Sequence, residues 1–179
     1  MKSLVCLIFL LSSCLVQAQQ KFHVEKGKIS FISNAPLEII KASSDKLDGI
    51  IDVSSNQFAF LVQILSFKGF NGELQLEHFN EKYMESDKYP TASFKGKIID
   101  AVDFSKDGEY DVRVKGDLDV HGKTQTRIIK SKIIVKGGKI TIETKFTIPL
   151  VDHNISIPSI VSEKIATEIE VNINASMSQ

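Results

Sequence analysis

The sequence predicts an all-β protein whose strands form an antiparallel barrel of about eight strands. Short apolar runs with alternating side chains recur along the chain, and turns containing Gly, Asn or Asp separate them. Neighbouring runs are close enough in sequence to pair as hairpins, and a closed sheet leaves no exposed edge strand. The segment from Leu74 to Phe94 departs from this pattern and predicts one or two short helices. A two-sheet sandwich is the alternative architecture.

The first 18 residues have the pattern of a signal peptide. Lys2 supplies a positive charge, Leu4–Leu11 an apolar core, and Ala18 a small residue at the cleavage site. The stretch Leu11–Cys14 also fits a lipobox, in which Cys14 would become the first residue of a lipid-anchored protein. Both patterns predict export, to the periplasm or out of the cell.

Cleavage after Ala18 would leave a single domain, residues 19–179, with 161 of the 179 residues and with 21 basic against 22 acidic side chains. Both cysteines, Cys6 and Cys14, belong to the leader. The mature domain therefore has no disulfide and no thiolate for catalysis or metal binding. Its near-zero charge argues against nucleic acid, and no later segment is long and apolar enough to span a bilayer.

The N-terminal part of the mature chain predicts a hairpin and several further strands. Phe22–Val24, a turn at Lys26-Gly27 and the alternating run Ile29–Ile32 would form the hairpin. The run Phe58–Leu65 is apolar at both even and odd positions, so we expect a strand that is covered on both faces. Two more extended units are expected over Leu37–Ile40 and Gly49–Val53.

The C-terminal half predicts hairpins with clearer turns. In Tyr110–Val120 apolar and charged residues alternate, which predicts one buried face and one solvated face. A strand over Thr91–Asp100 should lead into it through a tight Asp-Gly turn at Lys106–Gly108. The remaining expected strands are Thr126–Val135 and Lys139–Ile148, joined by a Gly137-Gly138 turn, and a final strand over Ile165–Ala175.

The helical segment carries large apolar side chains on one side. Phe79, Tyr83 and Met84 recur at helical spacing, and Pro90 then turns the chain back to an extended conformation. Charged residues between them should form a solvated face. A single apolar helical segment beside a barrel is expected to line or cover the mouth of its interior.

Four stretches of the chain match one known pattern in order and spacing. They are Ser33–Glu38, Leu74–Ser86 followed by Lys88–Gly96, Lys115–Thr124, and Phe146–Pro158. In these stretches the chain resembles the YceI-like family, secreted lipocalin-like proteins associated with polyisoprenoid binding, over nearly the whole mature domain. The resemblance implies an extended antiparallel barrel closed over a hydrophobic tunnel that takes an isoprenoid or fatty chain.

The aromatic residues are concentrated in the middle of the chain, around the helical segment. A single phenylalanine is more often ordinary core, but a barrel that only fills itself can use Val, Ile and Leu. The group therefore predicts an apolar tunnel for an isoprenoid or fatty lipid, with no other cofactor. The candidate ligand-binding residues are Phe58, Phe60, Phe67, Phe70, Phe79, Tyr83, Met84, Phe94 and Phe146.

Other chemistries find little support, and we predict no catalytic residue and no metal ligand. His78, His121 and His153 lack the spacing of a zinc site, and His121 is expected to brace a turn before Gly122. The run Asp103–Gly108 imitates the start of a calcium loop, but Val114 stands where a bidentate glutamate is needed. No Gly-x-Ser-x-Gly elbow is present.

The leading hypothesis is an exported lipid-binding protein that sequesters or carries a long apolar molecule. One alternative is a non-catalytic stress-response or interaction module with a filled barrel core. The least favoured is an enzyme acting on lipid, for which Asp152 and His153 would have to face the interior. The sequence leaves the oligomeric state open, with a homodimer among the alternatives.

Overall fold

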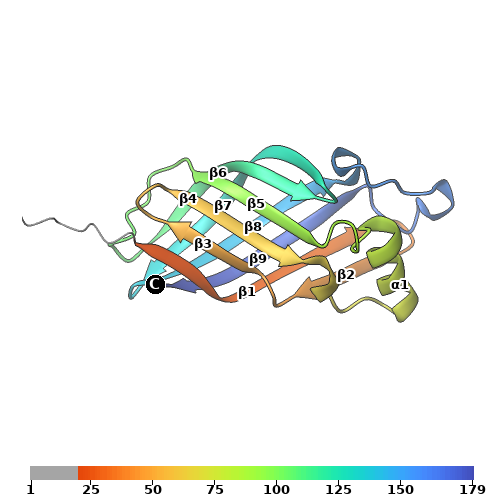
Figure 1. Cartoon of the computed structure of the whole chain (residues 1–179), viewed down its shortest axis with the longest axis horizontal. Coiled ribbons are helices and arrows are strands. Elements are labelled where there is room, and N and C mark those ends of the chain that lie inside the picture. Colours follow the sequence, from red (N-terminus) through yellow and green to blue (C-terminus); the bar gives the residue numbers. More distant parts are fainter. Residues whose placement is uncertain (1–19) are drawn as a thin grey trace, which may run out of the picture.

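The computed structural model describes residues 20–179; the predicted leader, with Cys6 and Cys14, lies outside this part. A single sheet wraps into an elongated barrel, with the short helix α1 (Glu73–His78) at one end and the C-terminus at the other (Figure 1). The strands of the described part are β1 (Lys21–Asn34), β2 (Ile39–Ser44), β3 (Asp48–Asp52), β4 (Gln57–Gln63), β5 (Thr91–Ile98), β6 (Gly108–Val120), β7 (Lys123–Lys136), β8 (Lys139–Pro149) and β9 (Glu168–Ser178).

The sheet is antiparallel and closed. Its order is β2-β1-β3-β4-β5-β6-β7-β8-β9, and β1 also pairs with β9. Strands β2 and β3 follow one another along the same side of β1, so together they take one position in the ring. The nine strands of the described part therefore fill eight positions, which confirms the predicted antiparallel barrel of about eight strands and rules out the sandwich.

The predicted hairpin at Lys26-Gly27 is wrong, because β1 is one continuous strand of 14 residues. The chain makes only a bulge there, between Val24 and Lys26 in the pairing with β9. Gly27 serves a close approach instead of a turn: a Cβ atom at this position would lie 2.5 Å from the carbonyl oxygen of Leu47.

The expectation that the strand at Phe58–Leu65 is covered on both faces is also wrong. The even positions, such as Phe58 and Val62, point inward and are buried. The odd positions point to solvent, with Leu61 41% and Leu65 62% exposed. The barrel wall is a single layer, and no helix of the described part packs on its outside at this strand.

The connection between β5 and β6 is a loop, not the tight Asp-Gly turn that we expected. Asp103 organises it: its carboxylate accepts a hydrogen bond from the Ser105 amide at 3.1 Å, and its carbonyl accepts one from the Tyr110 hydroxyl at 3.1 Å. The extra length lets Phe104 reach over the end of the barrel, where its ring lies 6.4 Å from that of Phe22. This loop closes one end of the barrel.

The remaining strand predictions agree with the structure more closely, except that the unit expected over Leu37–Ile40 begins at Ile39 and runs to Ser44. Inward residues of β6 are buried, and the glycines of the β7–β8 turn have φ values of +57° and +74°, as a two-residue type I′ hairpin requires. The last strand is shifted towards the C-terminus and runs to Ser178. In residues 20–179 no helix is long and apolar enough to cross a membrane.

Candidate functional site

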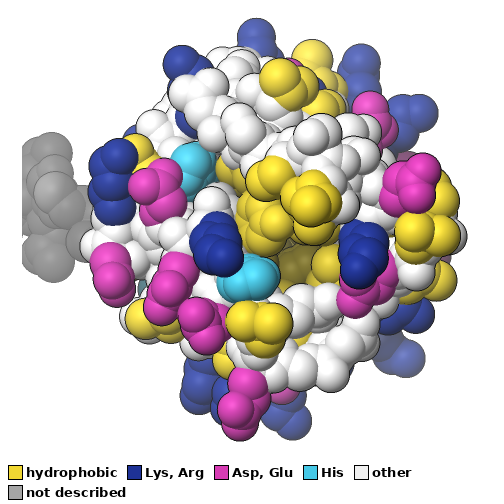
Figure 2. Space-filling view, turned by 90° about the vertical axis from the view of Figure 1, so that its right-hand side faces the viewer, with side chains coloured by type: hydrophobic (Ala, Val, Ile, Leu, Met, Phe, Trp, Pro, Cys, Tyr) yellow, Lys and Arg dark blue, Asp and Glu magenta, His cyan; other side chains and the backbone are white. Residues whose placement is uncertain are grey.

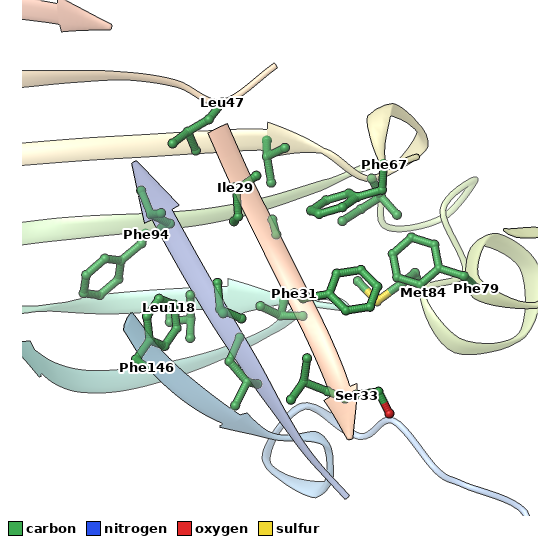
Figure 3. A pocket seen from close by; sticks show the side chains of 18 of the residues that line it. Ile29, Phe31, Ser33, Leu47, Phe67, Phe79, Met84, Phe94, Leu118 and Phe146 are labelled. Atoms are coloured by element: carbon green, nitrogen blue, oxygen red, sulfur yellow. The ribbon is translucent and has the colours of Figure 1, made fainter. Parts of the chain in front are cut away.

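The interior of the barrel holds a cavity of about 590 Å³. It opens at the end that carries α1, where apolar side chains surround a hollow and charged side chains lie around it (Figure 2). Inward side chains from the strands form its wall, as Figure 3 shows for Ile29, Leu118 and Phe146. The volume is within the range of small-molecule sites, ~300–1,000 Å³.

Four aromatic rings from three separate segments form one wall near the mouth. Phe31 of β1 stacks on Phe79, with ring centroids 5.4 Å apart and planes at 21°. Phe67 and Phe70, which follow β4, contact both rings, with Phe70 4.9 Å from Phe79. Such tilted and offset contacts stabilise one another and present a continuous apolar surface to the cavity.

The helical segment is held against the mouth by backbone hydrogen bonds. After α1, residues Phe79–Tyr83 form a π-helical turn, in which the Met84 amide donates to the Phe79 carbonyl at 2.9 Å. This hydrogen bond spans one residue more than that of an α-helix. The wider turn places both Phe79 and Met84 on the cavity wall. The Ile64 amide donates to the Pro90 carbonyl at 2.9 Å, and this hydrogen bond joins the two ends of the connection between β4 and β5.

His121 joins the exit of this segment to two other loops. Its Nδ1 lies 3.1 Å from the His153 carbonyl oxygen and its Nε2 lies 2.6 Å from Glu85 Oε2. Both partners are acceptors, so both hydrogen bonds form only when each ring nitrogen carries a proton. Glu85 and His121 have left-handed φ values of 43° and 54°. The expected bracing role of His121 is confirmed, and it extends to the 3₁₀ turn Leu150–His153.

The same turn requires glycine at position 122. Gly122 has φ of +66°, and a Cβ atom there would lie 2.2 Å from Cε1 of Tyr89. The Tyr89 ring packs edge-on against His121, with centroids 4.7 Å apart. The Tyr89 and His121-Gly122 elements, far apart in sequence, therefore form one packed unit beside the mouth.

Polar residues line the cavity mainly at its rim. Glu38 accepts a hydrogen bond from Gln75 at 2.9 Å, and His78 lies 3.0 Å from the Lys82 ammonium. Lys164 is exposed at the same end. Tyr83 also lines the cavity, and burial raises the pKa of its hydroxyl. These groups could contact the part of a ligand that protrudes from the barrel.

All nine residues proposed from the sequence line this one cavity. That they bind a ligand stays a prediction. The sequence reasoning missed Phe31, which is central to the aromatic wall, and it missed the aliphatic wall. Alternation along β1 was the available indication, because Ile29, Phe31 and Ser33 share the inward face. Phe31 lies within the predicted alternating run Ile29–Ile32, far in sequence from the aromatic residues around the helical segment.

Asp152 and His153 do not line the cavity. His153 is fully buried, with Nδ1 2.9 Å from the Lys123 carbonyl oxygen, and the Asp152 carboxylate lies 3.5 Å from Arg127. The inward-facing pair that a lipid-processing enzyme would need is therefore not formed by these residues. Within residues 20–179 no three His, Cys, Asp or Glu side chains are grouped as a metal site.

The closed antiparallel sheet and its apolar interior define a lipocalin-like barrel. The model of the YceI-like domain matches residues 21–177, and the chain therefore belongs to the YceI-like family. No curated protein matches it in sequence.

Solved structures share the fold at low sequence identity. A polyisoprenoid binding domain from Saccharophagus degradans is 13% identical and has a TM-score of 0.74, with 89% of this chain and 99% of that one covered. BcnA of Burkholderia cenocepacia is 16% identical, with a TM-score of 0.69 and coverage of 84% and 95%. A YceI protein of Campylobacter jejuni is 17% identical, with a TM-score of 0.58 and coverage of 75% and 82%.

Proposed function

We propose that this protein binds a long apolar molecule, an isoprenoid or fatty chain, inside the barrel. The observation that carries the proposal is the cavity of about 590 Å³, whose wall is aromatic and aliphatic and which opens at one end. Membership of the YceI-like family and the polyisoprenoid-binding description of the Saccharophagus degradans domain support the same class of ligand.

Burial of the hydrocarbon chain can drive the binding. Burial of ten methylene groups contributes about 8 kcal/mol at ~0.8 kcal/mol each. This exceeds the lower estimates of the cost of association, about 4 kcal/mol. Binding of this kind needs no catalytic group, and we propose a sequestering or carrying role without catalysis. The interaction-module alternative expects a filled core, so the cavity favours lipid binding.

The proposed site of action is outside the cytoplasm. The pattern of residues 1–18 supports export to the periplasm or beyond, and the lipobox at Leu11–Cys14 supports a lipid-anchored form as the alternative. Metabolic labelling with a fatty-acid probe separates the two, because only the anchored form incorporates label at Cys14.

Native mass spectrometry of the purified mature protein, followed by organic extraction, tests the binding proposal. We expect a co-purifying apolar molecule that is released by solvent. Ala92 lines the cavity, so Ala92→Phe should fill space and reduce the bound fraction. Ile128 is exposed on the outer face of β7, so Ile128→Phe is the matched control. Absence of lipid in the unmodified protein, and no uptake of added isoprenoid alcohols or fatty acids, would contradict the proposal.

A further inference from the structure

The cavity ends at an inner floor, which lies at the same level on the neighbouring strands β7 and β8. On β7, Ile133 lines the cavity, whereas the next inward residue, Val135, is buried in the core beyond it. On β8, Ile142 lines the cavity and Ile140 is buried beyond it. The two steps coincide, because Ile133 pairs with Ile142 and Val135 pairs with Ile140. An inserted molecule therefore ends at this layer.

Directly above the floor lie two hydroxyl side chains, Ser131 and Thr144, which we call the hydroxyl pair. They stand opposite each other on β7 and β8, and both line the cavity. Both are half-buried. Their inward neighbours along and across the strands are apolar: Ile129, Ile133, Ile142, Phe146 and Ile173. The pair is thus a polar spot at the deep end of an apolar cavity.

The two hydroxyl groups of the pair carry two protons, and the hydrogen bond between them uses only one. Thr144 Oγ1 donates to Ser131 Oγ at 2.8 Å. Each hydroxyl carries one proton, so that of Ser131 remains for another acceptor. In the described part of the chain the structure shows no second hydrogen bond from Ser131. An apolar ligand end at this position would strip water from that donor without replacing the hydrogen bond, which costs affinity.

We propose that the hydroxyl pair binds a neutral oxygen acceptor, such as a carbonyl, ether or hydroxyl oxygen, at the inserted end of the ligand. The ligand then enters with its oxygen-bearing end first, and its hydrocarbon chain extends past Phe146 to the aromatic wall at the mouth (Figure 3). This inference rests on the proposed lipid binding and specifies its ligand class and orientation.

The positions of the charged residues that line the cavity explain why we expect a neutral acceptor on the ligand. Three of the residues that line the cavity are ionisable and lie at its rim: Glu38, His78 and Lys164. The inner end contributes hydroxyl and hydrocarbon side chains, so a buried carboxylate or phosphate would have no counter-ion there. A fatty acid or a lipid phosphate would have to leave its charged end at the mouth, and the hydroxyl pair would then face a methyl group.

Displacement of a bound apolar fluorescent dye from the delipidated mature protein tests the proposal. The probes are hexadecan-1-ol, hexadecane and palmitate, which have the same chain length. We expect the alcohol to bind more tightly than the other two, and Ser131→Ala to weaken only the alcohol, by about fivefold. Thr144→Val leaves the Ser131 proton in place and should reduce the alcohol preference less than Ser131→Ala. Thr147→Val, on the exposed outer face of β8, is the matched control and should change nothing.

The outcomes separate this inference from the proposed function. If none of the probes binds the unmodified protein, both fail. If the probes bind but the alcohol has no advantage, or if Ser131→Ala weakens all probes equally, lipid binding stands and the hydroxyl pair is only a cross-strand contact. Ser131→Thr keeps the hydroxyl and should restore alcohol preference. The comparison of probes on the unmodified protein stands even if a variant fails to fold.

Discussion

The two ends of the barrel are built from the same alternating strands, yet one is solid and the other is hollow. At the closed end Phe22, Phe104 and Met177 fill the interior and are almost completely buried. At the open end residues such as Phe31 and Phe79 are only partly buried and face the cavity. Alternation selects which side chains point inward, whereas the loops at each end determine whether the space between them is filled.

The loops explain this difference. At the closed end, the β5–β6 loop folds Phe104 over the barrel, and the short β7–β8 turn adds little bulk. At the open end, the excursion between β4 and β5 carries α1 and the π-helical turn along the wall, and His121 fastens it to two further loops. Stability is therefore concentrated at one end and the candidate binding surface at the other.

Truncation of a ring at each end should separate these roles most strongly. Phe22→Ala removes a fully packed side chain, and we expect a loss of about 3–5 kcal/mol in the free energy of unfolding. Phe70→Ala at the open end should cost far less, because its ring already borders empty space. Urea unfolding measures both. Equal losses would contradict the division into a solid and a hollow end.

Glycine substitution tests the packed unit beside the mouth. Gly122→Ala forces a methyl group into the Tyr89 ring at a left-handed φ, and we expect a loss of about 2–3 kcal/mol in unfolding free energy. Gly137→Ala is the matched control: its φ is also positive, but the space around it is open. The control should lose only about 1 kcal/mol. Similar thermal unfolding shifts for both variants would disprove the steric argument.

Removal of the Glu85 carboxylate should loosen the open end selectively. Glu85→Gln replaces a charge-assisted hydrogen bond with a neutral one, and we expect a loss of about 1–2 kcal/mol. Hydrogen exchange should become faster in residues 79–89 and stay unchanged around Phe104. Asp87→Asn, at an exposed neighbouring position, serves as the control. Faster exchange throughout the barrel would show that the His121 contacts stabilise the whole fold instead.

Acid should destabilise the closing loop between β5 and β6, and this is the smallest expected effect. Arg113 holds the pKa of Asp100 at about 2, and hydrogen bonds from Lys106 and Ser105 hold that of Asp103 at about 2. Both values lie below those of the unfolded chain, about 3.9, so their stabilising contribution is complete above pH ~4 and is lost as the pH falls towards 2.

One variant tests whether the Asp100 carboxylate causes this pH dependence. Asp100→Asn should melt at a lower temperature than the unmodified protein at pH 6, and the two melting temperatures should converge near pH 2. A gap that is constant over this range would mean that the carboxylate acts through its shape and not through its charge.

The sequence by itself determined the inward face of most strands, because side chains alternate with a period of two and an apolar set must be buried. It also placed the helical segment, the Gly137-Gly138 turn, and nine residues that share the cavity. The closing pairing of β1 with β9 could not be read from local pattern, because the partners lie more than a hundred residues apart.

Tertiary structure alone decided which part of the barrel is filled and which polar side chains contact one another. The contacts of His121 with Glu85 and with the His153 carbonyl, and the pairing of Ser131 with Thr144, depend on strand register and loop closure. Register is set by the packing of the whole ring, since a shift of one residue would turn every inward side chain outward. For this reason the apolar lining and the helical segment at the mouth were predictable, whereas the depth of the cavity and its polar spots were not.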